Sequence, residues 1–151
     1  MLRNTCLSLF AVLVLSATPL AGAADAGPWT DLGGGIAGVT GIPVLAGQGA
    51  LSAGTPGDIT LSSAAPSAPC LLFFSFLEVG VPFKGGTLSA YPPLATFLFS
   101  TNPAGSVTLP WSTWPAGLPA GLELFFQTAV ADTTAVQNVA LSNLLRGVIQ
   151  P

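Results

Sequence analysis

Glycine and proline divide this chain into apolar segments that are too short for long helices. The 151 residues include 18 glycines and 14 prolines, and half of the sequence is hydrophobic. Proline disrupts the interior of a helix, and both residue types are common in turns. No long stretch carries the 3.6-residue apolar period of an amphipathic helix. The pattern therefore predicts many short strands joined by turns.

Alternation with a period of two supports strands at several positions. In segment 57–63, Ile59 and Leu61 point to one side while polar residues point to the other, and segment 105–109 repeats this pattern. Longer runs have apolar side chains on both faces, as central strands do: 70–79, 94–101 and 122–132. Further strands are expected at 35–39, 50–53, 86–90 and 141–148.

The strand candidates recur about every ten residues, which is typical of sandwiches and jelly rolls. We predict an all-β fold: a single antiparallel β-sandwich, jelly-roll or immunoglobulin-like, with about seven to ten short strands. Segment 133–143 is the one place where a helical turn is an alternative. The core is expected to contain Leu72, Phe74, Phe76, Leu98, Val107, Leu109, Leu124, Phe126 and Val130.

The first 23 residues resemble a secretory signal peptide. Arg3 supplies a basic start, residues 6–17 are almost entirely apolar, and Ala21 and Ala23 form an Ala-x-Ala cleavage pattern. A retained anchor is the alternative, but the apolar stretch is shorter than the ~20 residues that cross a bilayer. We predict a cleaved signal at 1–23, a β-sandwich domain at 24–151, and a secreted or periplasmic location.

Charge is scarce throughout the sequence. Three basic and six acidic residues are the only charged groups, and histidine is absent. An average domain is roughly a quarter charged. Behind the signal only Lys84 and Arg146 remain as cations, which disfavours nucleic acid and anionic membranes as partners. No apolar run in segment 24–151 is long enough to span a membrane.

The same scarcity excludes several kinds of chemistry. Without histidine there is no Ser-His-Asp or Cys-His site, and the commonest zinc ligand is missing. Segment 33–38 fits Gly-x-Gly-x-x-Gly, but no strand and crossover helix surround it, so a nucleotide loop is disfavoured. Once Cys6 leaves with the signal, Cys70 is expected to be a buried, unreactive thiol; a thiol that pairs between chains is the alternative. We predict no enzyme activity, no metal and no cofactor.

The chain resembles a known family through elements that cover nearly all of its length after the signal. These elements are 32–38, 41–45, 83–88 and 118–124, Gln127, Val130, Asp132 and 141–143. They resemble the Ala/Gly/Pro-rich β-sandwich domains of exported bacterial proteins, which are often C-terminal modules. The resemblance implies an uncharacterised secreted module, and it implies no catalytic residues.

Aromatic residues are the best binding candidates. Trp111 and Trp114 lie between two prolines in a connection between strands, and Tyr91 precedes two further prolines. Exposed tryptophan rings stack on sugars without any charge. The alternative, which we favour, is that both tryptophans cover one end of the core.

Carboxylates allow two further hypotheses. Glu78 and Glu123 could act as a glycosidase pair if the fold holds them roughly 5–10 Å apart. Asp58 and Asp132 could bind calcium, although capping of turns is the favoured interpretation. Gln127, Asp132, Asn138 and Asn143 are expected to support loops through hydrogen bonds rather than to form a site.

These observations together favour an exported, non-enzymatic structural or interaction domain. Its partner would be an envelope or extracellular protein or a glycan. The alternative is a carbohydrate-binding module centred on Trp111 and Trp114, and a small glycoside hydrolase is a remote third hypothesis.

Overall fold

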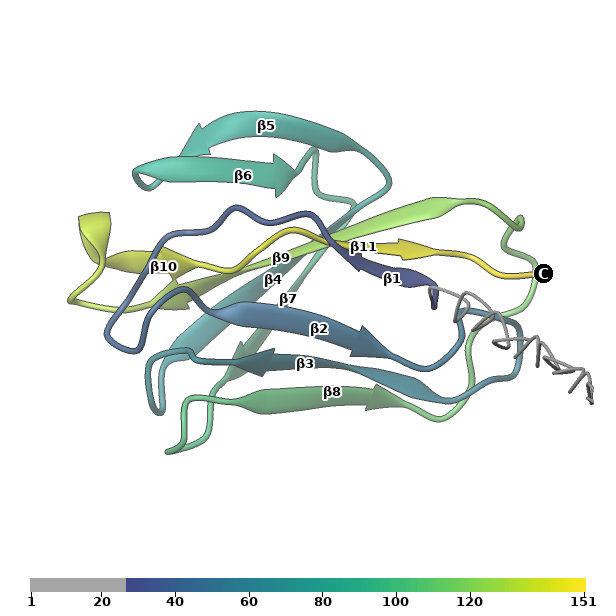
Figure 1. The fold of residues 1–151 in the computed structure, drawn as a ribbon, viewed down its shortest axis with the longest axis horizontal. Helices are drawn as coiled ribbons and strands as arrows, with labels where there is room; N and C mark the ends of the chain where they lie inside the picture. The colour runs from purple at the N-terminus through teal and green to yellow at the C-terminus, as the bar shows by residue number, and fades with distance from the viewer. Residues whose placement is uncertain (1–26) are drawn as a thin grey trace, which may run out of the picture.

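The computed structural model describes residues 27–151, so the expected signal peptide at 1–23 lies outside the described residues. The described part is almost entirely β-structure, which confirms the predicted all-β sandwich (Figure 1). None of its helices is long and apolar enough to cross a membrane. Its elements are β1 (Trp29–Asp31), β2 (Val44–Gln48), β3 (Gly57–Ser62), β4 (Pro69–Ser75), β5 (Glu78–Phe83), β6 (Gly86–Ala90), β7 (Ala95–Ser100), β8 (Val107–Trp111), β9 (Glu123–Ala131), the 3-10 turn η1 (Val136–Asn138), β10 (Val139–Leu141) and β11 (Leu145–Val148).

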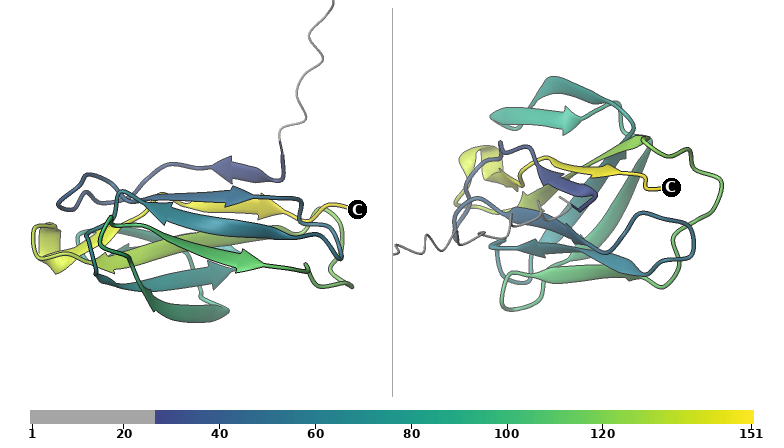
Figure 2. Two further views of the ribbon diagram at one scale, coloured as in Figure 1. Left: turned by 90° about the horizontal axis from the view of Figure 1, so that it is seen from below. Right: turned by 45° about the vertical axis from the view of Figure 1, so that its right-hand side comes forward.

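The strands form three layers (Figures 1 and 2). The middle layer is a six-stranded sheet in the order β1-β11-β9-β4-β7, with β10 paired to a different part of β9. One face of this sheet packs on the three-stranded sheet β2-β3-β8, and the other face packs on the β5-β6 hairpin. Every strand pair is antiparallel.

Strand β9 is the centre of the molecule. Its residues 124–130 are all buried, and it pairs with β4 on one side and with β10 and β11 on the other. Apolar residues on both faces of β9 therefore meet two different cores, as the run at 122–132 predicts.

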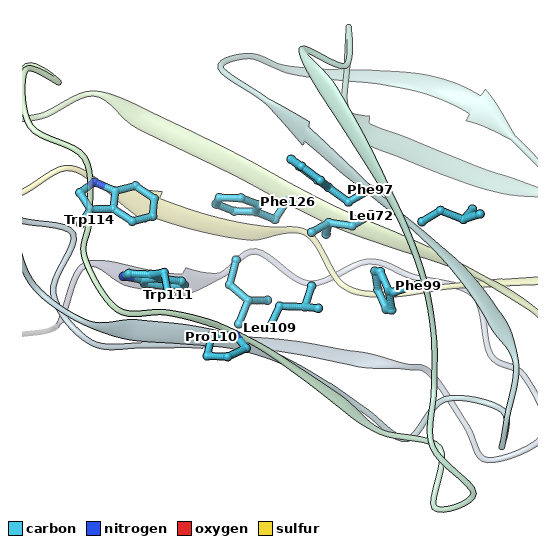
Figure 3. Close-up of a pocket in the computed structure, with 10 residues that line it drawn as sticks. Leu72, Phe97, Phe99, Leu109, Pro110, Trp111, Trp114 and Phe126 are labelled. Atoms are coloured by element: carbon cyan, nitrogen blue, oxygen red, sulfur yellow. The ribbon is translucent and has the colours of Figure 1, made fainter.

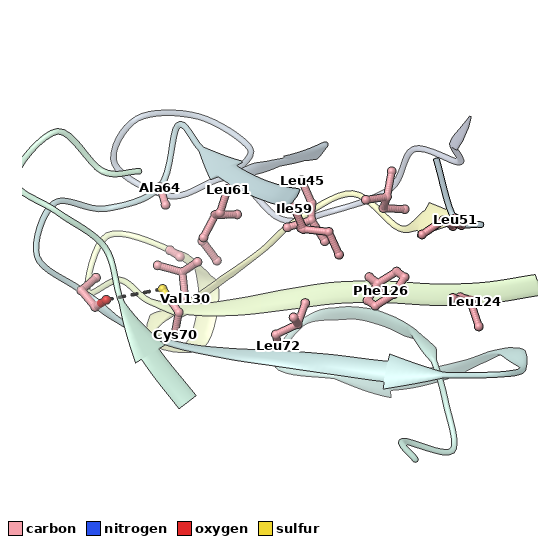
Figure 4. Close-up of a cluster of buried hydrophobic side chains, with 14 of the residues drawn as sticks. Leu45, Leu51, Ile59, Leu61, Ala64, Cys70, Leu72, Leu124, Phe126 and Val130 are labelled. Carbon is pink, nitrogen blue, oxygen red and sulfur yellow. Dashed lines mark hydrogen bonds between the residues drawn. The ribbon is translucent and has the colours of Figure 1, made fainter. Parts of the chain in front are cut away.

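The two cores lie on opposite faces of the six-stranded sheet. The larger one fills the space against β2-β3-β8 and includes Leu45, Leu61, Leu72, Phe126 and Val130 (Figure 4). The smaller one, beneath the hairpin, includes Phe73, Leu88, Phe125 and Leu141. Burying apolar area stabilises each layer by roughly 25 cal/mol per Å².

Two buried amides tie the outer layers to the middle sheet. Gln127 on β9 accepts a hydrogen bond from Ser89 N (2.8 Å) and donates to Thr87 O (3.3 Å), both on β6. Asn143 accepts from the backbone N–H of Leu45 on β2 (2.6 Å) and donates to its carbonyl (3.0 Å). Both residues are hydrogen-bonded supports, as predicted, but the partners named here belong to strands β6 and β2 rather than to loops.

Two runs that are continuous in sequence divide into separate strands, so there are slightly more strands than predicted. Segment 70–79 becomes β4 and β5, which belong to different layers because the chain turns after Ser75. Within segment 141–148, β10 ends at Leu141 and β11 begins at Leu145. Short strands on either side of a turn carry the same alternation as one longer strand, so the period does not reveal the break.

Two expected strands are not formed. Segment 50–53 leads into a turn over residues 52–55, in which the Thr55 N–H donates to Ser52 O (3.2 Å), and the neighbouring strand is β2 instead. Segment 35–39 makes only isolated bridges, such as Ile36 to Leu141. Gly35 has a φ of 106°, and a Cβ there would lie 2.7 Å from Leu141 O, so this close approach requires glycine.

The expected core is correct for the central strands and wrong at the margin. Leu72, Leu124, Phe126 and Val130 are buried, and Phe74, Val107 and Leu109 pack half-buried against the larger core. Leu98 is 81% exposed and Phe76 is 40% exposed, so both assignments are wrong. Leu98 lies on the final strand of its sheet, and Phe76 follows the end of β4.

Candidate functional site

The sandwich has one open side, between the last strands of its two sheets. Strand β7 ends the six-stranded sheet and β8 ends the three-stranded sheet. A groove of about 430 Å³ lies between them (Figure 3). All of the residues that line it are apolar: Ile59, Leu72, Phe97, Leu98, Phe99, Leu109, Pro110, Trp111, Trp114 and Phe126.

Strand register explains why the groove is apolar. Phe97 lies opposite Leu72, and Phe99 lies opposite Cys70, so these β7 residues share the inner face of the sheet with core residues of β4. On the facing sheet, Leu109 lies opposite Ile59. Inner-face side chains that would be covered in a closed sandwich therefore line an open groove here, and Phe97 remains 53% exposed.

Trp111 and Trp114 form one end of this groove. Trp111 lies over Gly57, where a Cβ would overlap the indole ring. Trp114 is fixed by backbone hydrogen bonds with Thr55 and Gly54, both 2.9 Å. The two ring centroids are 5.1 Å apart and the planes are inclined by 60°, so the rings do not form a single flat surface. Both residues are half-buried, and their indole nitrogens have no hydrogen-bond partner within the part of the chain that the structure describes.

The tryptophans belong to a longer series of aromatic contacts across that end of the sandwich. The ring centroid of Trp29 lies 6.1 Å from that of Trp111 and 6.0 Å from that of Phe126. Phe126 in turn stacks on Phe74, with 5.1 Å between the ring centroids. Trp29 also donates a hydrogen bond to Gly49 O (2.9 Å). Aromatic pairs at such separations stabilise by about 0.5–1.5 kcal/mol beyond their buried area. These contacts hold the aromatic side chains at this end of the groove in fixed positions.

Tyr91 does not join the two tryptophans. It lies between β6 and β7, is 39% exposed, and is absent from the groove lining. The structure thus brings together two of the three predicted aromatic residues.

The predicted carboxylate pair does not meet at the groove. Glu123 forms an ion pair with Arg146 at 3.2 Å on the six-stranded sheet, while Glu78 lies on the hairpin, and neither residue lines the groove. From residue 27 onward, no three His, Cys, Asp or Glu residues are grouped so that they could hold a metal ion.

Asp132 has a structural environment. Its carboxylate accepts hydrogen bonds from Val39 N (2.6 Å) and from Thr134 N (2.9 Å) and Oγ1 (2.7 Å), which makes it a turn cap as predicted. Burial acts to raise the pKa of Asp132, but these hydrogen bonds outweigh it and hold the pKa below its usual value. Asp58 accepts a hydrogen bond from Thr60 Oγ1 (3.1 Å) within β3.

Cys70 is buried in the larger core, as predicted. Its thiol lies 3.4 Å from the carbonyl of Ala68, to which it donates. Burial raises its pKa to about 11, against a smaller opposing effect of a backbone hydrogen bond at Thr101. The thiol is therefore protonated and unreactive at neutral pH.

Sequence reasoning missed Phe97 and Phe99 as site residues. The signal that could have indicated them is the composition of 95–100, an apolar strand with neither charge nor proline.

No family model, curated protein or solved structure matches this chain. The resemblance to exported β-sandwich modules therefore stays a prediction.

Proposed function

We propose that this chain acts outside the cytoplasm as a non-enzymatic interaction domain, and that its open side docks an apolar polypeptide segment. The observation that carries the proposal is the 430 Å³ groove lined only by apolar residues. It lies beside an edge strand whose backbone can pair with an extended segment. Phe97 and Leu98 extend the apolar surface beyond the groove mouth.

The site also has the form that polypeptide docking requires. Strand addition supplies backbone hydrogen bonds, and pockets beside the edge accept alternate side chains. The groove lies on the side of β7 to which Phe97 and Phe99 point, so every second side chain of an added strand would enter it. The inclined tryptophans form a wall for such side chains.

A defined peptide tests the proposal. The probe is a dansylated peptide of alternating valine and phenylalanine with lysine at each end, and the readout is energy transfer from Trp111 and Trp114. Removal of one buried phenylalanine contact costs about 1.5–3 kcal/mol, so we expect Phe97→Lys to weaken binding at least about tenfold. Phe97 is half-exposed, and circular dichroism should show an intact fold.

Val136→Lys is the matched control, because Val136 is 60% exposed on η1, away from the groove lining. We expect it to bind the peptide as the original chain does. Absence of binding, or equal loss in both variants, would contradict the proposal. If soluble oligosaccharides bind instead and Trp114→Ala abolishes that binding, the site is a carbohydrate site.

A further inference from the structure

We infer that the polypeptide docked at β7 is a second copy of this chain, paired antiparallel through residues 96–100 about a twofold axis at Leu98. This inference names the partner for the function proposed above and rests on it. Pairing of this kind would join two six-stranded sheets into one continuous sheet.

Strand β7 lacks the protection found at other sheet edges, such as β8 and β5. Strand β8 contains Pro110, which has no N–H to donate at the edge. Strand β5 carries Glu78, Pro82 and an irregular register. Strands β1 and β2 lie against each other and close the opposite side of the sandwich (Figure 2). Strand β2 also has no charge, proline or bulge, but it lies against β1, and β6 is hydrogen-bonded to Gln127 through Ser89 N and Thr87 O. Strand β7 has none of these features either, and no strand of the described chain lies beyond it in its sheet.

Strand β7 is also complementary to itself. By strand alternation, the side chains of residues 97 and 99 point to the groove face, whereas those of 96, 98 and 100 point to the opposite face. Leu98 lies at the rim and borders both the groove and the hollow on the outer face. With Leu98 opposite Leu98 of the second copy, Phe97 meets Phe99 and Thr96 meets Ser100. Aromatic side chains thus pair with aromatic ones, and hydroxyl with hydroxyl, both of which stabilise a sheet. The alternative centred on Phe97 would place Thr96 opposite Leu98 and Ala95 opposite Phe99.

The exposure of Leu98 favours the same partner. At 81% exposed it is the most exposed of the large hydrophobic residues in the described chain. It adjoins a shallow hollow of about 190 Å³ on the outer face of the sheet, lined by Leu71, Ala129 and Val139 among others. A second copy centred on Leu98 would cover this leucine on one face and the mouths of both grooves on the other.

Because position 98 faces itself across the axis, charges of opposite sign provide a specific test. The purified chain, in the processed form that the cell produces, is examined by sedimentation equilibrium, together with Leu98→Lys, Leu98→Glu and their equimolar mixture. We expect a dimer for the original chain, monomers for each variant alone, and a dimer for the mixture. Val136→Lys is the control and should remain dimeric.

Three results would overturn the inference. These are a monomeric original chain at every concentration, dimers of each charged variant alone, or variants that stay monomeric when mixed. A second measurement avoids dependence on charge: Leu98→Cys should form an interchain disulfide on oxidation, and Val136→Cys should not. If the original chain is monomeric while the dansylated peptide still binds in a Phe97-dependent manner, the docking function stands and only the identity of the partner is wrong.

Discussion

Strands β9 and β7 have similar apolar sequences and opposite environments. In β9, seven consecutive residues are buried, whereas in β7 every residue is exposed or half-buried. The two strands lie on either side of β4 in the same sheet. Position in the sheet therefore decides which apolar residues stabilise the fold and which remain free to bind.

The difference arises from what covers each face. Strand β9 lies between the three-stranded sheet and the hairpin, so both of its faces are packed. Over β7 the inner face opens into the groove, and Leu98 remains exposed on the outer face. Substitutions of apolar residues in the two strands should separate stability from docking.

The largest expected effect is a charge introduced at Val130. Val130 is fully buried in β9, and an unpaired carboxylate there costs an amount on the order of the 5–15 kcal/mol that stabilises a typical domain. We expect Val130→Asp to unfold the chain, as seen by loss of cooperative denaturation. Leu98→Asp in β7 should change the free energy of unfolding by no more than about 0.5 kcal/mol in dilute protein. Equal effects at the two positions would contradict the comparison.

The contrast also shows which parts of the fold follow from sequence. The alternation at 57–63, the long run at 122–132 and the proline-marked turns predict β3, β9 and the all-β class, because local periodicity encodes them. The prediction that Leu98 and Phe76 lie in the core is wrong because their burial depends on which layer covers each position. That is a property of tertiary packing, which the period of two does not contain.

The candidate site was predictable to a smaller extent. Trp111 and Trp114 are noticeable because tryptophan is rare and both lie beside proline. Phe97 and Phe99 resemble core residues in sequence. Only the strand order, with β7 and β8 at the ends of their sheets, makes them a surface.

The next effect in size concerns Gln127, a buried polar residue of β9. Replacing it with alanine leaves Ser89 N–H without its acceptor beneath the hairpin, and an unsatisfied buried group costs about 1–3 kcal/mol. We expect Gln127→Ala to lower the free energy of unfolding by that amount in a urea titration. Gln48→Ala, at an exposed position of β2, is the control and should have little effect. A neutral Gln127→Ala would show that the hairpin is not held by this amide.

A smaller effect should appear at acidic pH through Asp132, directly after β9. Its pKa is lower in the folded state than in the unfolded chain, so its stabilisation is complete above the unfolded value of about 3.9. That stabilisation is lost as the pH falls below this value through the folded pKa. We expect Asp132→Asn to be less stable than the original chain by about 1 kcal/mol at pH 7. The difference should shrink as the pH falls below about 4; a constant difference would contradict the assignment.

The smallest expected effect is on the rate at which Cys70 is labelled. Cys70 lies between the compared strands, opposite Val130 of β9 and Phe99 of β7. Its raised pKa, about 11, and its burial make the native thiol slow to react with iodoacetamide at pH 8. An edge strand opens locally more readily than a central one. Reaction should therefore proceed through separation of β7 from β4, at a lower free energy than global unfolding. Phe99→Ala, which loosens β7, should accelerate labelling by a larger factor than its effect on global stability accounts for. If instead labelling follows global unfolding in every variant, β7 is held as firmly as β9, and exposure alone does not make this edge free to exchange partners.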